Sequence, residues 1–562
     1  MPTPQNGEQN GLPNNYRMVT NSEHSHPAGH QLLEKSAAAE TITATLILRR
    51  RPGSAPLKDL AFFRTTPASG RRYLSHKEFA DLHGAAQTDL DKVADFAHAN
   101  GLEVVESDAA RRSVVVRGPA AQINKAFAVN LQHYQSPFGA YHGHEGPANL
   151  PADIADIVET VVGLDNRQVP ARHYTADPPN TKSITPQQVA NLYNFPKGTG
   201  SGQTIGIYEM AIGNSKPGYS MTDVTATFKA FGGSLKVPQI TDVSVDEETN
   251  TGVTDGETLL DITVSGAIAQ QAKLAVYFTA GASNQNIIHA LQRMIHPGAG
   301  DPEPTVISIS YGWTPDDTTE FTSSAEYNQM SQLFQDAAHL GITVLVSSGD
   351  SGAQFLSKTK AEASYPATDP WVLACGGTTI GGVNGTNFTE YVWNDSWKGI
   401  GQSEQHGATG GGISGFFPIP DYQQNTKIPT ALATGKAGRG IPDIAGNASP
   451  ISGYPQSQGG QVGGGGGTSA VAPLYAGLIA VINANLGNPV GFINPILYSL
   501  AQTVFHNISA PPGPANNSYG RVTGYPATAG WNACTGLGSI NGMALQDQLA
   551  MEQKKAATAV AL

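Results

Sequence analysis

The sequence of 562 residues is poor in cysteine and in charge, and each shortage excludes a class of protein. Cys375 and Cys534 are the only thiols, so neither a disulfide framework nor a cysteine-based metal cluster is available. Charged residues make up 14% of the chain, against about 25% in an average globular protein. The net charge of −12 argues against a nucleic-acid partner, because such binding depends on clustered Lys and Arg.

Long apolar runs and export signals are also missing. The best candidate for a membrane span, residues 468–483, is only moderately apolar and falls short of the roughly 18 residues that cross a bilayer. Residues 1–31 lack the basic start and the apolar segment of a signal peptide. We therefore expect no membrane partner, and any export would use another route or a leader that is not visible here.

Glycine and proline are abundant, at 64 and 37 residues, which indicates a compact and loop-rich protein. Charge is unevenly distributed: residues 1–182 contain 18 basic and 19 acidic side chains, whereas 183–562 contain 15 and 26. Ten of the 15 histidines precede residue 182. The two parts should therefore respond differently to acid.

The hydrophobic pattern divides the chain into two folded regions. Residues 1–38 are predicted to be a disordered lead, and 39–165 alternate strands and helices as in a small α+β domain. Residues 166–182 contain Pro and Arg without periodicity, which predicts an exposed linker with a processing site. Residues 183–562 alternate buried-type strands with helices, which indicates an α/β domain with a parallel sheet. The expected strands are 41–48, 102–106, 113–117, 204–209, 272–278, 305–310 and 343–347, and the expected helices are 75–99, 120–129, 257–269, 284–295, 325–340 and 474–485.

The strongest local signal is a run of glycines, residues 463–467, that leads through Thr468 and Ser469 into an apolar helix. A serine in this position can expose its hydroxyl to a substrate, with backbone N–H groups nearby to stabilise negative charge. Ser469 is therefore a candidate nucleophile. The alternative is that Thr468 or Ser469 is an ordinary N-cap.

A nucleophilic serine needs a base, and the sequence offers two kinds. His406 is the best histidine, and Asp350, His406 and Ser469 would stand in the chain order of a subtilisin triad. Glu257 and Asp261 are the other option, because residues four apart share one helix face and interacting carboxyls share a proton. The alternative for this pair is a capping box from Thr254 to Glu257, with Asp261 as an exposed acid.

Asp350 follows a buried strand and lies in the turn Ser348-Gly-Asp-Ser-Gly352. The carboxyl ends of parallel strands face the usual ligand crevice of α/β sheets. An aspartate in such a turn can equally be a structural residue that binds its own backbone.

Together these segments resemble the sedolisin family of serine-carboxyl peptidases, in detail its kumamolisin-like members, over nearly the whole chain. The matching motifs are E-x-x-x-D at 257–261, S-G-D-S-G at 348–352 and G-T-S-x-x-x-P at 467–473, supported by Ser310-Tyr-Gly312, 374–378, 438–447 and 534–538. The resemblance implies a ferredoxin-like activation prodomain at about 39–165 and a subtilisin-like α/β peptidase domain after it. Two departures concern subsite preference: Tyr311 stands where relatives have Trp, and Ser364 where they often have an acid.

The resemblance also implies roles for individual residues. Ser469 is then the nucleophile, Glu257 the general base and acid, Asp261 its orienting partner and Glu209 the next member of the network. A protonated Asp350 and the Ser469 N–H would stabilise the oxyanion. Carboxylates suit an enzyme that works near pH 4, because a histidine with a pKa of about 6.5 would already be protonated.

The expected function is that of a secreted, monomeric, acid-active endopeptidase, made as a self-processed proenzyme that its own prodomain inhibits and that acts on peptides and proteins. The alternatives are a conventional Ser/His hydrolase and a noncatalytic pseudoprotease. By resemblance calcium would bind near the C-terminus through Asn507, Ile508, Thr528, Gly530 and Asn532, but the family's two aspartates are here Asn507 and Asn532. Loss of both anions should weaken calcium binding, and amide hydrogen bonds could hold this loop without an ion.

Overall fold

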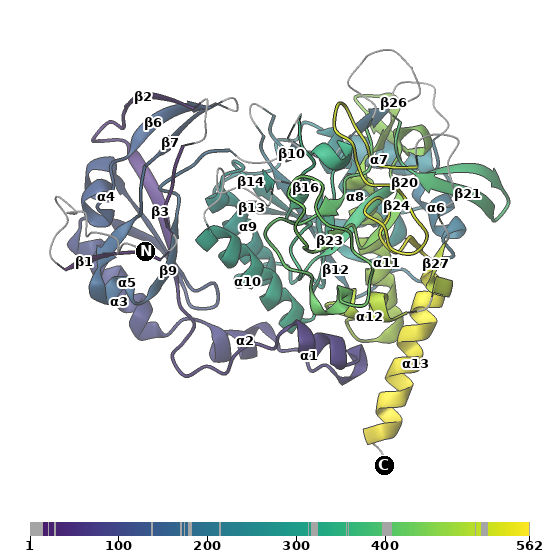
Figure 1. The fold of residues 1–562 in the computed structure, drawn as a ribbon, viewed down its shortest axis with the longest axis horizontal. Helices are drawn as coiled ribbons and strands as arrows, with labels where there is room; N and C mark the ends of the chain where they lie inside the picture. The colour runs from purple at the N-terminus through teal and green to yellow at the C-terminus, as the bar shows by residue number, and fades with distance from the viewer. Residues whose placement is uncertain are drawn as a thin grey trace.

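A computed structural model describes the chain as a smaller, N-terminal α+β unit beside a larger α/β unit, joined by a linker (Figure 1). It describes residues 15–560 apart from 21, 27–29, 137–138, 169–170, 173–174, 178–182, 213–214, 313, 316–323, 356, 358, 396–406, 501, 507 and 509–514.

The N-terminal unit is built on a four-stranded antiparallel sheet in the order β4-β5-β3-β9. In chain order its elements alternate as β3, α3, β4, β5, α4 and β9, and α3 and α4 pack on the sheet. This strand order and alternation are those of a ferredoxin-like fold, as expected. The bounds are β3 Thr41–Leu48, α1 Leu60–Thr65, α2 His76–His83, α3 Gln87–Ala99, β4 Glu103–Asp108, β5 Ser113–Pro119, α4 Ala120–Phe127 and β9 Val158–Val162.

Part of the segment predicted to be a disordered lead is structured instead. β1 (Tyr16–Met18) pairs with β8 (Asn149–Pro151), and β2 (Gln31–Lys35) adds an edge to β6 (Gln132–Ser136) and β7 (Gly139–Gly143). All five residues of β2 are exposed. Because these strands are held by backbone pairing rather than by apolar burial, their sequence carries no hydrophobic pattern that would reveal them.

The larger unit contains an eight-stranded sheet in the order β13-β14-β12-β15-β18-β20-β21, with β24 beside β20. Its pairs are parallel except for the hairpin β20–β21. This is the expected subtilisin-like arrangement. The bounds are β12 Thr204–Met210, β13 Gln239–Val245, β14 Lys273–Thr279, β15 Val306–Ile309, β18 Thr343–Ser347, β20 Leu373–Asn384, β21 Asn387–Val392 and β24 Ile444–Asn447.

Helices cover both faces of this sheet and create two hydrophobic cores. One core contains side chains from α9 and α10, and the other contains side chains from α7, α8 and α11. The segment 468–486 is long and apolar enough to cross a membrane, but 83% of its apolar window is buried inside this domain. The bounds are α6 Pro186–Leu192, α7 Met221–Phe231, α8 Gly256–Ile268, α9 Asn284–Ile295, α10 Ser324–Leu340, α11 Val471–Leu486, α12 Asn494–Ser499 and α13 Gly542–Val560.

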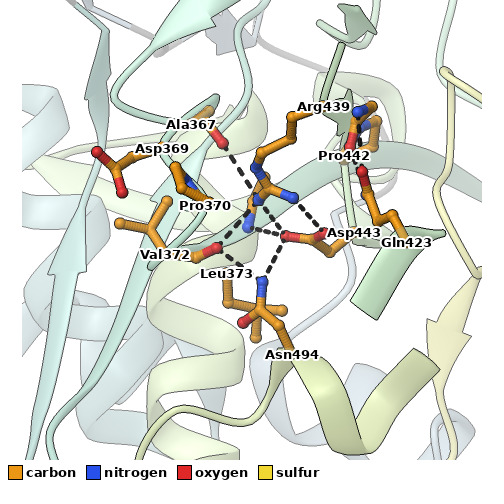
Figure 2. A network of polar contacts seen from close by, with 12 residues as sticks. Ala367, Asp369, Pro370, Val372, Leu373, Gln423, Arg439, Pro442, Asp443 and Asn494 are labelled. Atoms are coloured by element: carbon orange, nitrogen blue, oxygen red, sulfur yellow. Dashed lines mark hydrogen bonds and ion pairs between the residues drawn. The ribbon is translucent and has the colours of Figure 1, made fainter. Parts of the chain in front are cut away.

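A buried ion pair, Arg439 and Asp443, holds together segments that are distant in the sequence (Figure 2). The guanidinium of Arg439 donates to both carboxylate oxygens of Asp443 at 3.0 and 2.8 Å and to the carbonyl of Val372 at 3.1 Å. Asn494, at the start of α12, donates to the carboxylate of Asp443 at 3.1 Å. Both charged side chains are fully buried, so this network joins three separate segments without contact with solvent.

Candidate active site

The helix α8 carries two acidic side chains into the interior. Asp255 is its N-cap and accepts a hydrogen bond from the Glu257 N–H at 3.1 Å, whereas the Thr254 hydroxyl donates to Asp223 at 2.5 Å. The capping box from Thr254 is therefore not formed. Glu257 and Asp261 are both fully buried, one turn apart, which excludes the alternative of Asp261 as an exposed acid.

Ser310 links Asp261 to Ser469. Its hydroxyl lies 2.9 Å from a carboxylate oxygen of Asp261 and 3.3 Å from the carbonyl oxygen of Ser469. The Ser469 hydroxyl in turn donates to the carbonyl of Ser310 at 3.3 Å. The structure thus brings the predicted nucleophile and one predicted acid to the same residue at the end of strand β15.

Glu209, at the end of β12, joins this group through two hydroxyl donors. Its Oε2 accepts hydrogen bonds from Tyr311 at 2.6 Å and from Thr258 at 3.1 Å. Burial, together with the nearby charge of Glu209, raises the pKa of Asp261 well above its ordinary value, although the Ser310 hydroxyl acts in the opposite direction. Tyr311, noted in the sequence as a departure from relatives, thus contacts the acidic network.

Asp350 binds Thr468, the residue before the predicted nucleophile. One of its carboxylate oxygens accepts from the backbone N–H and from the hydroxyl of Thr468, both at 2.8 Å. The Thr468 hydroxyl also accepts from the Gly349 N–H at 3.0 Å. Asp350 therefore binds a segment more than a hundred residues away in sequence, a contact that a purely local structural turn would not make.

The N-cap interpretation of the serine motif is wrong. Thr468 and Ser469 form a 3₁₀ turn, and α11 begins only at Val471 with no side-chain cap. Gly467, before this turn, has a φ of 99°, which a residue with a side chain would adopt only with strain. The preceding glycines belong to a strand, β26 (Gln461–Gly466), and not to a loop.

The linker was predicted to be exposed, but it pairs with the strands next to the serines. β10 (Ala171–Arg172) is antiparallel to β16 (Tyr311–Gly312), and β11 (Thr175–Asp177) is antiparallel to β26. Arg167, which precedes these strands, is buried. Short strands paired to glycine-rich edges leave no periodicity in the sequence, which explains the difference.

The histidine that could serve as an alternative base, His406, lies outside the described residues. Three other histidines of the C-terminal part lie at the boundary with the N-terminal unit. His289 hydrogen bonds to Thr45 and Asp246, and His296 to Asp336, while His339 accepts from the Lys58 N–H.

Of the residues expected to bind calcium, Asn532 does not present the oxygen that the ion needs. The side-chain N–H₂ group of Asn532 donates to the carbonyl oxygens of Thr528 and Gly530, at 3.1 and 3.4 Å. These are two of the oxygens that calcium would need, and the amide presents hydrogen rather than oxygen to them. Among the described residues, no hydrogen bond from the Asn532 amide to the Ile508 carbonyl is found. Asn507 lies outside the described residues.

Comparison with known proteins identifies the family to which a chain with this arrangement belongs. The family model of the pro-kumamolisin activation domain matches residues 28–167, and that of the subtilase family matches 247–520. Kumamolisin from Bacillus sp. (strain MN-32) is 38% identical over 532 residues, which cover 91% of this chain and 92% of kumamolisin. The chain belongs to the kumamolisin–sedolisin family of serine-carboxyl peptidases.

Other relatives agree with this family. Sedolisin from Pseudomonas sp. (strain 101) is 27% identical over 535 residues, which cover 90% of this chain and 86% of sedolisin. The solved structure of Pseudomonas sedolisin, a serine-carboxyl proteinase complexed with two molecules of pseudo-iodotyrostatin, matches 66% of this chain and 98% of its own with a TM-score of 0.55 and 25% identity. The protein is therefore a serine-type peptidase made with an activation prodomain, and its N-terminal unit is that prodomain.

Sequence reasoning missed the residues that connect the site. Ser310 and Thr468 were read only as parts of motifs, and Thr258 was not singled out. Their position inside the motifs was the available signal, because the contacts themselves span 49 to 159 residues. Ser364, expected near the substrate pocket, is buried in β19 (Ser364–Tyr365).

Proposed function

We propose that Ser469 attacks the substrate carbonyl, with Glu257 as general base and then general acid, Asp261 orienting Glu257, and Glu209 completing the network. Asp350, when protonated, and the Ser469 N–H would stabilise the oxyanion. The observation that supports this best is the Ser310 hydroxyl, which joins the Asp261 carboxylate to the Ser469 backbone. It couples Asp261 on α8 to the serine in the 3₁₀ turn that precedes α11.

The proposed mechanism operates in acid. The pKa of Asp261 is raised by burial and by the charge of Glu209, so this carboxyl keeps its proton at a pH where an exposed aspartate has lost it. An oxyanion donor at Asp350 also needs a proton, which acid supplies. A carboxylate base remains usable near pH 4, at which a histidine would be protonated.

The proposed substrates are peptides and proteins that bind as the linker does, in extended form along β16 and β26. This geometry supports endopeptidase activity, because the linker is internal to the chain. We place self-processing between Arg172 and Thr175, within the linker 166–182 that joins the prodomain, 39–165, to the peptidase domain, 183–562. A secreted monomer in an acidic environment, with no membrane or nucleic-acid partner, completes the proposal.

Single substitutions test the assignment. Ser469→Ala, Glu257→Gln and Asp350→Asn should each reduce peptide cleavage at pH 4 by about a thousandfold or more, while the uncut precursor accumulates. Mass spectrometry of the wild-type products should place the cut between residues 172 and 175. Turnover close to wild type in any of the three variants would overturn its assigned role.

His406→Ala separates the carboxyl mechanism from a Ser/His hydrolase. The variant should keep its activity at pH 4 if Glu257 is the base. If His406 is the base, the wild type should be active only near neutral pH and the variant should be inactive there. Absence of cleavage by the wild-type chain at every pH would instead indicate a noncatalytic pseudoprotease.

A further inference from the structure

A segment of the prodomain, residues 57–75, lies against the peptidase domain far in sequence from the linker, and we call it the arm. It contains α1 and runs beside α12 at the base of the molecule (Figure 1). Phe63 of the arm is 2% exposed and packs edge-on against Trp371 and Phe492, with ring centroids 5.6 Å apart in both cases. The arm thus fills an apolar groove of the peptidase domain.

The groove is shaped for a second aromatic side chain, Tyr73. Its hydroxyl donates to the carbonyl of Val490 at 2.9 Å. A Cβ atom at Gly341 would lie 2.8 Å from the Tyr73 ring, and one at Gly491 would lie 2.4 Å from its hydroxyl. Two glycines of the peptidase domain therefore leave the space that Tyr73 occupies. Arg71, also buried, donates to the carbonyl of Phe492.

His339, on α10, holds the arm through one nitrogen that must carry no proton. Its Nδ1 lies 2.9 Å from the carbonyl of Gln335, which can only accept, so Nδ1 bears the hydrogen. Its Nε2 lies 2.8 Å from the backbone N–H of Lys58, which can only donate. A second proton on the ring would set two donors against each other.

Two further hydrogen bonds hold the arm to α10 beside His339, and we call this group of contacts the clamp. Gln335 donates from its side-chain amide to the carbonyl of Lys58 at 3.0 Å, and the carbonyl of His339 accepts from the Leu74 N–H at 3.1 Å. The arm is thus bound at both of its ends by α10.

We propose that the groove between α10 and residues 490–492 is a second docking site of the peptidase domain, that the arm of this chain is its occupant, and that proton uptake by His339 releases the arm. This site lies outside the catalytic group and would keep the prodomain bound after the linker is cut. It deepens the proposed zymogen activation, and it does not require that Ser469 be the nucleophile.

The burial of His339 and the charges around it confine release of the arm to acidic pH. Burial is the main reason that its pKa is lowered, and His83 and Arg50 act in the same direction, whereas Asp336 and the Gln335 carbonyl oppose them. The arm itself adds the Lys58 N–H and the Phe63 ring. Because the docked ring resists protonation, docking is complete above about pH 6.5 and weakens as the pH falls below that value.

Hydrogen–deuterium exchange of the full chain carrying Ser469→Ala, which should prevent self-cleavage, tests this at matched pH values between 7.5 and 4. Amides of the arm should lose about tenfold in protection on acidification relative to those of β3 and β5. Adding His339→Gln, which keeps a neutral acceptor, should move this loss to lower pH. His339→Lys, charged at every pH used, should show it already at pH 7.5.

Gln335→Leu is the matched control, because it removes a contact of the same clamp without removing a titrating group. It should lower protection of the arm at every pH and leave the midpoint of the pH dependence unchanged. The proposal fails if the arm stays protected at pH 4. It also fails if the chain with Ser469→Ala alone and the chain with both Ser469→Ala and His339→Gln lose protection of the arm at the same pH. None of these readings measures peptide cleavage, and the intact mass of each chain shows whether its linker is still uncut. A failure of the proposed function is therefore distinguishable from a failure of this proposal.

Discussion

The boundary between prodomain and peptidase domain and the interior of the peptidase domain both bury carboxyl groups, but they give them different partners. At the boundary Asp336 lies between Arg50, at 2.6 Å, and His296, at 3.0 Å. In the interior Glu390 accepts hydrogen bonds from the hydroxyls of Tyr193, Thr378 and Ser539. A guanidinium and an imidazole hold the first group, and neutral hydroxyls hold the second.

The partner decides the direction of the pKa. Burial alone would raise the pKa of Asp165 in the prodomain, but the hydrogen bonds and charge of Arg167 lower it to about 2. Burial dominates in the interior, where it raises the pKa of Glu390 and brings that of Asp369 to about 6. Equal burial therefore gives opposite responses to acid.

The two responses suit a protein that separates in acid. A carboxyl with a lowered pKa stabilises the folded state above its unfolded pKa, and this stability is lost as the pH falls through the folded pKa. A carboxyl with a raised pKa contributes its stability at low pH, and this is lost as the pH rises through the folded pKa. Burial would raise the pKa of Asp336 as well, but Arg50 and His296 lower it. Acid should therefore weaken the boundary at Asp336 while it favours the peptidase interior at Glu390 and Asp369.

The largest expected effect comes from the interior pair that breaks this pattern, Arg439 and Asp443 (Figure 2). Arg439→Met would leave Asp443 buried without a cation, and we expect a loss of about 3–5 kcal/mol in the free energy of unfolding. Chemical denaturation of the chain carrying Ser469→Ala measures it. Adding Asp443→Asn should restore part of the loss, and a double variant less stable than Arg439→Met would contradict this explanation.

Asp369→Asn should have the next largest effect, and with the opposite sign. Ionising Asp369 in place costs the wild type about 3 kcal/mol at neutral pH, because its pKa of about 6 lies roughly two units above the ordinary value. Its stability is complete below about pH 4 and is lost as the pH rises to about 6. The variant should therefore melt at a higher temperature at pH 7.5 and unchanged at pH 3.5.

The matched control for Asp369→Asn is Asp95→Asn, since Asp95 is exposed on α3. It should leave the melting temperature unchanged at both pH values. A gain from Asp369→Asn that is equal at pH 3.5 and 7.5 would show that the effect does not come from proton binding.

Much of this fold could be predicted from the sequence where burial imposes a pattern. β18 and α9 have the predicted bounds, because a wholly buried strand is a short continuous apolar run and an amphipathic helix has a clear period. β2, with five exposed residues, could not be found, and neither could the linker strands β10 and β11. Their order depends on pairing with distant edges, which no local pattern records.

The residues of the candidate site can also be divided into those that the sequence predicts and those that it does not. Motifs indicated Glu257, Asp261, Asp350 and Ser469, and the structure shows which of these share a neighbour. The role of Ser310 as that neighbour was not predictable, because its contacts reach back 49 residues and forward 159. The opposite treatment of carboxyls at the boundary and in the interior also depends on partners that only the fold brings together.

Arg50→Gln tests the boundary side of the comparison with a smaller effect. Arg50 is 20% exposed, so we expect a loss of about 1–3 kcal/mol in docking rather than the full cost of a buried pair. The wild-type precursor should be stable near neutrality and mature at about pH 4 to 5, and the variant should mature at a higher pH. Gel analysis of processing across the pH range measures this.

Arg72→Gln provides the control for Arg50→Gln, because Arg72 is 79% exposed and pairs with Glu78 on the surface. Such pairs contribute little, so the pH of maturation should not change. Equally fast maturation of the wild type at pH 7.5 and pH 4.5 would refute the assignment of acid sensitivity to the boundary.

The smallest expected effect concerns the C-terminal loop, where amides replace carboxylates and no charge needs to be balanced. Because Asn532 donates to the carbonyls of Thr528 and Gly530, the loop is already satisfied without an ion. Chelator should therefore leave the melting temperature and peptide cleavage unchanged. The double substitution Asn507→Asp with Asn532→Asp should instead create a calcium-dependent rise in melting temperature, since it restores two anionic ligands and removes the competing donor. A fall of many degrees in the melting temperature when chelator is added to the unmodified chain would show that neutral oxygens suffice to bind calcium here. The comparison between cation-paired and hydroxyl-bound carboxyls would then apply only to the rest of the molecule.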